Sequence, residues 1–551
     1  MEVARAEVLE WAEVTTLLAR FAVTAAGQDR ARALAPRREA EAVRDALRET
    51  REARWALAAG GEPPWDGVAD LRPIVTQLAV EGATLEGAAL AALGRTIEAG
   101  HRLKGYGARL GRGAPGVADR CHALPTLRPL LEALKTALDP EGQLLDGASP
   151  RLHGLRRRLQ AVRGDLQERL EALLADPEIV PALQERYVTV RNGRYVVPVR
   201  GDARRRIHGI VHDRSASGAT LFIEPQGVVE LNNHLVHLAL EERDEEARLL
   251  RALTRRARAH LAELQALADG LAALDLAFAK ARLAERLDAV EPEIADAGGV
   301  RLLAARHPLL VVQGWQGGEP VVPIDLRLGD DTRLLLLTGP NAGGKTVALK
   351  TLGLLTLMAQ AGLHLPVAEG SRLPVFERLF ALIGDEQSLA ENLSTFSSFV
   401  RQVREILERV DGRSLVLLDE LGAGTDPAEG AALGEAILEA LLDRGALVAA
   451  TTHLEPLKVF AALEPRAANA TVAFDAERLA PIFRIEYGHP GQSYALTIGA
   501  RLGLPPGLIE RARGRLATAS RRLEALLGEL EARVRAAEAR AAEAARLQQE
   551  A

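Results

Sequence analysis

The chain has 551 residues, and at roughly 150 residues per domain this length predicts three or four domains and excludes a minimal single-core module. Hydrophobic residues make up 48% of it and aromatic residues only 3%, so aliphatic and alanine-rich helices must supply most of the packing. Its 69 basic and 75 acidic residues leave a formal net charge of -6. Any contact with nucleic acid must therefore come from a local basic patch and not from the overall field.

Cysteine content and hydropathy indicate the compartment. The single cysteine, Cys121, cannot form an intramolecular disulfide, and no Cys/His cluster has the spacing of a zinc site. The first residues lack a basic stretch followed by an apolar one, and no later run of about 18 apolar residues occurs. These features predict a cytoplasmic protein that is neither exported nor membrane-spanning.

The first half of the chain has a mainly helical pattern. Residues 1–180 carry alanine, leucine, arginine and glutamate at helical spacing, which predicts several long amphipathic helices. Short β-rich runs separated by turn residues follow in 187–224 and predict a small β-island. Residues 228–288 return to a long, charged helical pattern.

After Gly298 and Gly299 strands alternate with helices. Short apolar runs at 334–337, 415–418 and 447–450 are typical of the buried parallel strands of an α/β domain. Residues 508–551 predict a final helix whose apolar stripe fades without a terminating turn. Two interpretations of this ending stay open, a frayed terminal helix and a coiled-coil linker that leads to a further domain.

One eight-residue segment matches the phosphate-loop pattern G-x-x-x-x-G-K-[ST], between an apolar strand and a helix predicted to begin near Val347. In such a loop backbone N–H groups surround the phosphates, Lys345 reaches the β and γ phosphates, and the Thr346 hydroxyl ligates Mg²⁺. The segment consists of Gly339, Pro340, Asn341, Ala342, Gly343, Gly344, Lys345 and Thr346. It predicts that ATP and Mg²⁺ are bound here.

Two carboxylates at the end of a later apolar strand complement this loop, about 70 residues downstream. Asp419 is predicted to hold Mg²⁺, through water, and Glu420 to polarise the attacking water. A third strand ends before His453, where an imidazole would sense the γ-phosphate. A structural role for this lone histidine is the alternative.

Two further segments have the composition of site loops. Residues 422–427 are too glycine-rich for regular structure, and we interpret them as a loop beside a paired site. Residues 392–399 predict a Ser/Thr-rich helix start whose hydroxyls and N–H groups could face an anion, although an ordinary capped helix explains the spacing equally well.

Together, these motifs resemble the ATPase domain of the MutS family, which belongs to the ABC-type ATPases. Segments 338–347, 389–399 and 418–427 are especially similar to the second bacterial branch, MutS type two, as are 191–199 and 212–225 outside the ATPase region. The resemblance covers essentially the whole chain. It implies a multidomain fold: a helical core and lever over 1–180, a clamp region with the β-island over 181–290, an ABC-type ATPase domain over 291–507 and a coiled-coil linker helix over 508–551.

The resemblance also implies a homodimer, a ring of two chains that closes when nucleotide binds. In the family two ATPase domains pair, so that Ser394 and its neighbours would reach the nucleotide of the other subunit. The loop that contains Asp426 would line the same interface, and we count both residues as nucleotide-binding.

Two departures from the family pattern limit what can be carried over. The phosphate loop begins at 339, which leaves no room for the mismatch-reading and connector domains of mismatch-repair proteins, and we interpret the single Phe-x-Glu triplet, at 222–224, as coincidence. Type two proteins normally continue into a small MutS-related (Smr) nuclease domain, whereas this sequence stops at Ala551. We therefore expect no nuclease activity from the residues present.

Arginine clusters are the candidate nucleic-acid contacts, since guanidinium groups suit phosphates. One cluster lies at 151–158 and another at 251–258, but the cluster of Arg200, Arg204, Arg205 and Arg206 lies on a turn of the β-island, where a clamp tip would be. Solvated helix faces are the alternative interpretation of all three. No aromatic platform accompanies the favoured cluster, so we expect it to contact the backbone and not to read bases.

The predicted function is that of a homodimeric, Mg²⁺-dependent ATPase that clamps branched or unusual DNA, and the resemblance suggests suppression of homologous recombination. The resemblance equally suggests a sensor of collided ribosomes that uses ATP hydrolysis to split them and binds rRNA. No residue separates these two functions. A tether of the SMC type is a weaker third interpretation, because those proteins separate the two nucleotide motifs by a very long coiled coil.

Overall fold

The computed structural model describes residues 1–4, 6–296, 298–315, 317–329, 332–339, 344–384, 395–475, 480–489, 496, 499–500 and 503–515. These residues fall into two compact units, which are described separately. The first contains residues 1–63, 109–119 and the chain from 272 onward, and the second contains residues 64–108 and 120–271.

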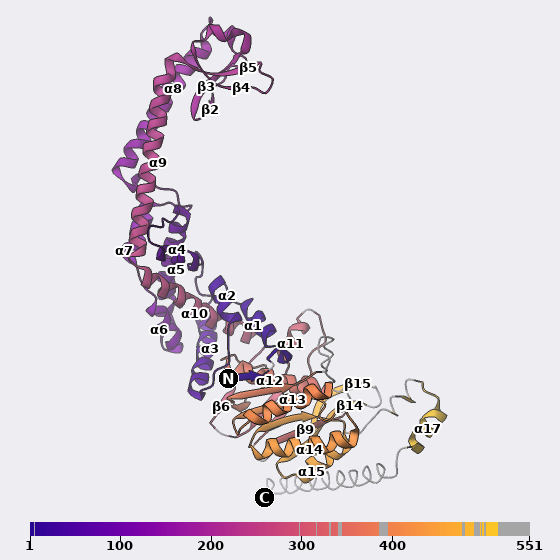
Figure 1. Cartoon of the computed structure of the whole chain (residues 1–551). Coiled ribbons are helices and arrows are strands. Elements are labelled where there is room, and N and C mark those ends of the chain that lie inside the picture. The colour runs from indigo at the N-terminus through magenta and orange to yellow at the C-terminus, as the bar shows by residue number, and fades with distance from the viewer. Residues whose placement is uncertain are drawn as a thin grey trace. The chain divides into compact units, whose positions relative to one another are not determined.

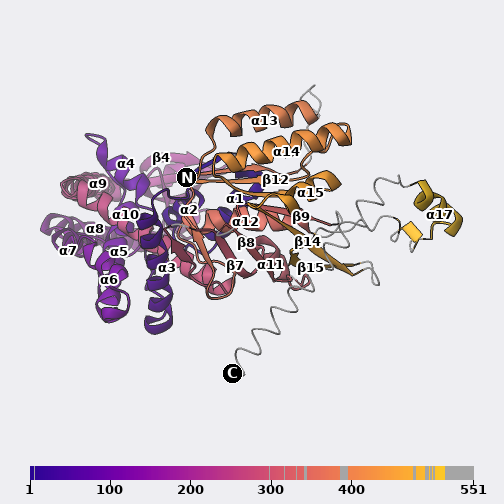
Figure 2. The ribbon, with the colours of Figure 1, turned by 90° about the horizontal axis from the view of Figure 1, so that it is seen from below.

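A seven-stranded sheet forms the centre of the first unit, in the order β1-β11-β12-β13-β9-β14-β15 (Figures 1 and 2). Six of the strands run parallel, and β15 pairs antiparallel to β14. The strands are β1 (Glu2–Ala4), β9 (Leu334–Thr338), β11 (Arg378–Leu382), β12 (Ser414–Leu418), β13 (Leu447–Thr451), β14 (Ala467–Asp475) and β15 (Ala480–Tyr487). The predicted strands at 334–337, 415–418 and 447–450 are thus confirmed.

Both faces of this sheet are buried at β9, β12 and β13, which explains why these strands are apolar without alternation. Leu335, Leu417 and Ala449 pack on one side with the helix α12 (Lys345–Gln360). The neighbouring residues of the same strands pack on the other side with α13 (Thr395–Arg409), α14 (Pro427–Asp443) and α15 (Glu455–Leu463). Figure 2 shows α13 and α14 together on one face.

The N-terminal segment differs from the all-helical pattern predicted for residues 1–180. β1 pairs in parallel with β11, and Leu9, Leu18 and Leu47 belong to the same core as α12. Three residues are too few to produce a readable strand periodicity, so local sequence could not reveal β1. The other elements of this unit are α1 (Trp11–Ala19), α2 (Ala25–Arg32), α3 (Ala40–Gly60), α11 (Pro308–Gly314), α17 (Pro506–Arg515) and a second sheet, β6-β10-β7-β8 (Glu293–Ala295, Arg372–Pro374, Val300–Ala305 and Ile324–Leu328).

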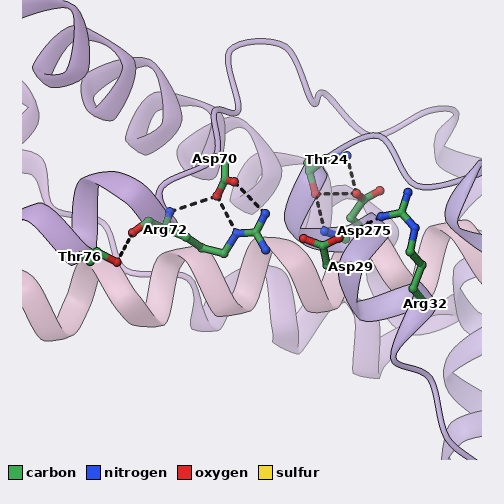
Figure 3. A network of polar contacts seen from close by, with 8 residues as sticks. Thr24, Asp29, Arg32, Asp70, Arg72, Thr76 and Asp275 are labelled. Carbon is green, nitrogen blue, oxygen red and sulfur yellow. Dashed lines mark hydrogen bonds and ion pairs between the residues drawn. The ribbon is translucent and has the colours of Figure 1, made fainter.

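A buried carboxylate joins α10 (Leu261–Arg286) to the start of α2 within this unit. Asp275 is fully buried and accepts hydrogen bonds from the backbone N–H of Val23 (3.0 Å) and from the backbone N–H and hydroxyl of Thr24 (2.7 Å each) (Figure 3). Thr24 in turn caps α2 by accepting from the N–H of Gly27. A Cβ at Gly27 would lie 2.2 Å from the Asp275 carboxylate, so this approach requires glycine.

The second unit carries the predicted β-island, a four-stranded antiparallel sheet in the order β2-β3-β5-β4. One side of the sheet shares a core with two long helices, α8 and α9. Asn232 of α9 bonds both the N–H and the C=O of Tyr195 in β3, at 3.0 Å each, and so holds the sheet to the helix. The elements wholly in this unit are α4 (Arg72–Ala79), α7 (Arg128–Ala137), α8 (Pro150–Ala175), β2 (Thr189–Arg191), β3 (Arg194–Arg200), β4 (Gly209–Arg214), β5 (Thr220–Pro225) and α9 (Val229–Arg258). The helices α5 (Gly87–Leu110) and α6 (Pro115–Ala123) have residues in both units.

Candidate functional site

The two ends of the phosphate-loop segment lie where the pattern predicts them. β9 ends at Thr338, Gly339 has φ 117°, Gly344 has φ 90°, and α12 begins at Lys345. Both glycines use backbone conformations that L side chains rarely adopt. Pro340, Asn341, Ala342 and Gly343 lie outside the described residues, so the phosphate contacts predicted for them stay predictions.

Lys345 lies at the first turn of α12 with its side chain almost wholly buried. Its ammonium group donates to the carbonyl of Gly339 at 2.6 Å and so spans the segment from one end to the other. Burial lowers the pKa of Lys345, while the nearby carboxylates of Glu420 and Asp419 oppose that shift. A cation held at the carbonyl of Gly339 and near two carboxylates is suited to a polyanionic ligand with its metal ion.

Asp419 connects three neighbouring strands at their carboxyl ends. Its Oδ2 accepts the hydroxyl of Thr346 at 2.7 Å, and its Oδ1 accepts the hydroxyl of Thr451 at the end of β13. Its backbone N–H donates to Leu382 at the end of β11. The parallel register therefore brings residues from β12, β13 and the start of α12 together, as expected at the carboxyl edge of such a sheet.

Thr451 is a site residue that sequence reasoning missed. Besides donating to Asp419, its hydroxyl accepts the backbone N–H of Glu420 at 2.8 Å. One side chain thus orients both carboxylate-bearing residues. The polar side chain at the end of an otherwise apolar strand could have indicated Thr451, but the sequence analysis predicted His453 as the site residue of this strand.

Glu420 has φ 51°, in the left-handed region. Such a conformation costs about 1–3 kcal/mol for a non-glycine residue and persists only where neighbouring contacts enforce it. Here the contacts are the N–H of Glu420 on Thr451 and the N–H of Leu421 on the carbonyl of Thr451. The backbone therefore turns sharply after Asp419, which gives the two successive acids different surroundings.

His453 lies two residues beyond β13, and its side chain is exposed. The preceding residue, Thr452, is buried and holds the turn by donating to the carbonyl of Leu421 at 3.0 Å and accepting the N–H of Leu454 at 3.1 Å. Among the described residues the imidazole forms no hydrogen bond or ion pair with the other site residues, so its role as γ-phosphate sensor stays a prediction.

Asp426 caps a helix. Its Oδ1 accepts the backbone N–H groups of Ala428 (2.9 Å) and Glu429 (3.2 Å) at the start of α14. The glycine-rich segment before it is a turn, in which a Cβ at Gly422 would lie 2.6 Å from Leu454. Ser394 lies outside the described residues. The roles of Asp426 and Ser394 at a paired nucleotide therefore stay predictions.

A mostly apolar cavity of about 340 Å³ lies beside Gly344 and the first turns of α12. His307 is 5% exposed, and its Nδ1 has no hydrogen-bond partner. Burial lowers the pKa of His307 to about 4, so the ring is neutral at pH 7. The cavity is lined by Ala305, His307, Leu310, Gln313, Gly314, Gly318, Glu319, Pro320, Val321, Val322, Ile324, Gly344, Val347, Ala348, Thr351, Val472, Phe483 and Ile485. Only Gly344 was among the predicted site residues.

The arginine clusters of the second unit differ in what they contact. Arg156 pairs with Asp146, Glu242 and Glu246, and Arg258 donates to three backbone carbonyls near the end of α4. Both arginines make contacts within the protein, so the clusters at 151–158 and 251–258 each have one candidate fewer for contacting nucleic acid.

The favoured cluster lies on a short 3-10 helix between β3 and β4. Arg200 pairs with Asp202 at 2.9 Å. Arg204, Arg205 and Arg206 are exposed and, within the described residues, their guanidinium groups have no partner. These three cations remain available for a ligand.

The Phe-x-Glu triplet has a structural explanation. Phe222 is 8% exposed beneath the guanidinium of Arg191, and Glu224 is fully buried. Glu224 pairs with Arg194 at 2.8 Å and His212 at 2.6 Å. Neither side chain is free to act as a wedge, in agreement with the interpretation as coincidence.

The described residues contain neither a membrane-spanning helix nor a cluster of metal ligands. No described helix is long and apolar enough to span a membrane. No group of three or more His, Cys, Asp or Glu side chains within these ranges could hold a metal ion. One carboxylate and one hydroxyl, as at Asp419 and Thr346, are nevertheless a donor set that fits Mg²⁺ bound to nucleotide phosphates.

Comparison with known proteins agrees with the resemblance. Residues 335–520 match the family model for MutS domain V. The chain is 46% identical over 544 residues to Endonuclease MutS2 of Thermomicrobium roseum, covering 96% of this chain and 68% of that protein. It is 44% identical to the proteins of the same name from Geobacillus kaustophilus (95% and 66%) and Pelotomaculum thermopropionicum (98% and 68%). It thus spans about two thirds of their length, and with such identity over nearly all of its residues the chain belongs to the MutS2 family.

Proposed function

We propose that this chain is a Mg²⁺-dependent ATPase that works in the cytoplasm as a homodimer and uses ATP to clamp branched or unusual DNA. The proposed ATPase activity rests on the arrangement of Lys345, Thr346 and Asp419, which lie close together. A buried ammonium at the start of a helix lies beside a hydroxyl–carboxylate pair 2.7 Å apart. This combination is what binding and hydrolysis of a nucleoside triphosphate require.

The cavity beside Gly344 supports a nucleotide as the ligand. Its volume of about 340 Å³ accommodates a purine base, and its apolar walls suit a flat ring. Gly344 borders both the cavity and the phosphate-loop segment, so one ligand could occupy the two. We propose that the base binds in the cavity and packs against Phe483 and Val322, which form part of its wall.

The residues divide the chemistry among them. Lys345 and the N-terminal N–H groups of α12 neutralise phosphate charge. Glu420, which follows Asp419 with a left-handed backbone, orients and polarises the attacking water. Thr346 and Asp419 would hold Mg²⁺, which when bound screens the charge that develops on the phosphate oxygens. His453 would contact the γ-phosphate, and Ser394 and the Asp426 loop would reach the nucleotide of the second subunit.

Arg204, Arg205 and Arg206 are the proposed DNA contacts, because they are exposed and unpaired among the described residues on one short turn. Arginine forks at this site would contact phosphates and select shape over base sequence. In the proposed role, ATP-controlled clamping of branched DNA suppresses homologous recombination.

A binding competition tests this function. The Glu420→Gln protein, with ATP, is offered a labelled four-way DNA junction against purified collided ribosomes at physiological salt. Preference for the junction supports the proposal. Preference for ribosomes contradicts the DNA function and assigns the arginines to rRNA in a ribosome-splitting ATPase.

A further inference from the structure

The far end of the nucleotide-binding helix α12 is held by two buried side chains. Gly362 ends the helix with φ 77°, which leaves the carbonyls of Ala361 and Gly362 outside the helical hydrogen-bond pattern. The Lys280 ammonium donates to Ala361 at 2.9 Å, and the Thr50 hydroxyl donates to Gly362 at 2.5 Å. Two different helices, α10 and α3, thus hold adjacent carbonyls.

A buried lysine is an energetically unfavourable choice for Lys280 if the side chain only caps the helix. Its side chain is 2% exposed, and burying an ammonium costs free energy that hydrogen bonds must offset. The negative end of the α12 dipole provides part of that compensation. The neutral hydroxyl of Thr50 holds the next carbonyl without this cost.

α12 is suited to carry a displacement from one end to the other. Most of its residues are buried, from Lys345 to Gln360, so the helix is packed on nearly every side. Closely packed interiors transmit strain because they deform little. A shift imposed by phosphates at Lys345 would therefore reach the carbonyl of Ala361.

α10 is the only one of the two holding helices with residues in both compact units, since its residues 261–271 belong to the second unit and 272–286 to the first. In the first unit Asp275 ties it to α2 and Lys280 ties it to α12. The chain before α10 is α9, whose Asn232 bonds the backbone of β3. β3 leads directly to the turn with Arg204.

We propose that Lys280 is a positioning residue that couples nucleotide occupancy at the start of α12 to nucleic-acid affinity, through its bond from α10 to Ala361. This inference rests on the proposed function. Coupling of two sites is reciprocal, so nucleic acid must change nucleotide affinity through Lys280 by the same factor.

The test uses the full chain and the coupling factor, defined as the Kd for a labelled four-way DNA junction without ATPγS divided by the Kd with it. We expect ATPγS to change the Kd of the wild-type protein for the junction by a factor of about 5–150, the usual range for allosteric coupling. Lys280→Met should bring the factor to about 1 and leave the Kd for ATPγS alone unchanged. Lys280→Arg, which keeps the charge, should restore most of the coupling.

Thr50→Val is the matched control, because it removes the hydrogen bond on the neighbouring carbonyl but leaves α10 attached. It should keep the wild-type coupling factor, even if it lowers the melting temperature as much as Lys280→Met. If Lys280→Met does not fold, Lys280→Leu serves as the second variant without a hydrogen-bond donor, with the same expected loss.

Several outcomes would overturn the inference. Wild-type coupling in the Lys280→Met protein, or equal loss of coupling in Thr50→Val, reduces Lys280 to a helix cap. If the wild-type protein binds both ATPγS and the junction but has a coupling factor of 1, the inference is refuted and the proposed ATPase activity is not. A wild-type protein that binds no ATPγS refutes the proposed function as well.

Discussion

At the end of β12 one threonine contacts two adjacent acids. Thr451 accepts the N–H of Glu420 and donates to the carboxylate of Asp419, and the backbone at Glu420 is left-handed. The strain of about 1–3 kcal/mol is stored where water activation is proposed, as strained residues at functional sites often are.

Variants of Lys345 and Glu420 should separate binding from hydrolysis. We expect Lys345→Ala to lose ATP binding because its cation on the phosphates is removed, and Glu420→Gln to bind ATP normally but turn over at least about 100-fold more slowly. Equilibrium binding of a fluorescent ATP analogue and steady-state phosphate release measure the two effects. Glu429→Gln, an exposed change in α14, is the control, and equal turnover in the Glu420 variant would refute its role.

Two buried histidines predict how stability depends on pH. Burial lowers the pKa of His307 and of His364 to about 4, below the unfolded value of 6.5. Between these values the unfolded chain binds more protons, so their contribution to stability is complete above pH 6.5 and is lost as the pH falls toward 4. From pH 7 to pH 5 each histidine should cost about 2 kcal/mol. The melting temperature should fall accordingly, and less steeply in His364→Gln; an equal slope in that variant would contradict the assignment.

At the scale of elements, the parallel sheet determines which residues meet. β13 lies between β12 and β9 in the sheet although β9 comes three strands before β12 in the chain, so the phosphate-loop helix, Thr451 and Asp419 converge at one edge. The strands β9, β12 and β13 and the phosphate-loop motif could be predicted from local pattern. Strand order could not, because it depends on which apolar faces pack together, and neither could the cavity, whose walls come from residues 305–324, 344–351, 472 and 483–485.

The cavity assignment predicts a difference between ligands with and without a base. Val322→Glu places a charge in an apolar wall, and we expect it to weaken ATP binding at least about tenfold by opposing burial of the ring. Inorganic tripolyphosphate, which lacks a base, should compete with similar affinity in wild type and variant. Calorimetry measures both, and parallel weakening of the two ligands would place the base elsewhere.

At the scale of the whole molecule, one short turn should dominate the salt dependence of nucleic-acid binding. Replacing Arg204, Arg205 and Arg206 by Ala should lower the slope of log K against log salt by up to about 3, close to one unit for each lost phosphate contact. The triple variant of Arg251, Arg255 and Arg256 removes the same charge from exposed positions of α9 and is the control. An unchanged slope in the first variant, or an equal change in both, would move the contact away from this turn.

Pairing of two chains around the nucleotide predicts complementation. A mixture of Ser394→Ala and Lys345→Ala proteins should recover part of the ATPase activity, because one composite site in each mixed dimer has both residues intact. Native mass spectrometry verifies the mixed dimers, and phosphate release measures the recovery. Verified mixed dimers without recovery would refute a shared site.

The amino-acid sequence by itself determined the phosphate-loop motif before α12, the acids after β12 and the β-island, because each depends on a local pattern: a glycine-rich motif, an apolar run or alternating strand residues. Only the tertiary structure decided which arginines are free, that β1 joins the central sheet, that Thr451 orients both acids and that Lys280 holds the far end of α12. These features depend on contacts between residues distant in sequence, and burial and pairing, which set the energy of a charge, exist only once those residues meet.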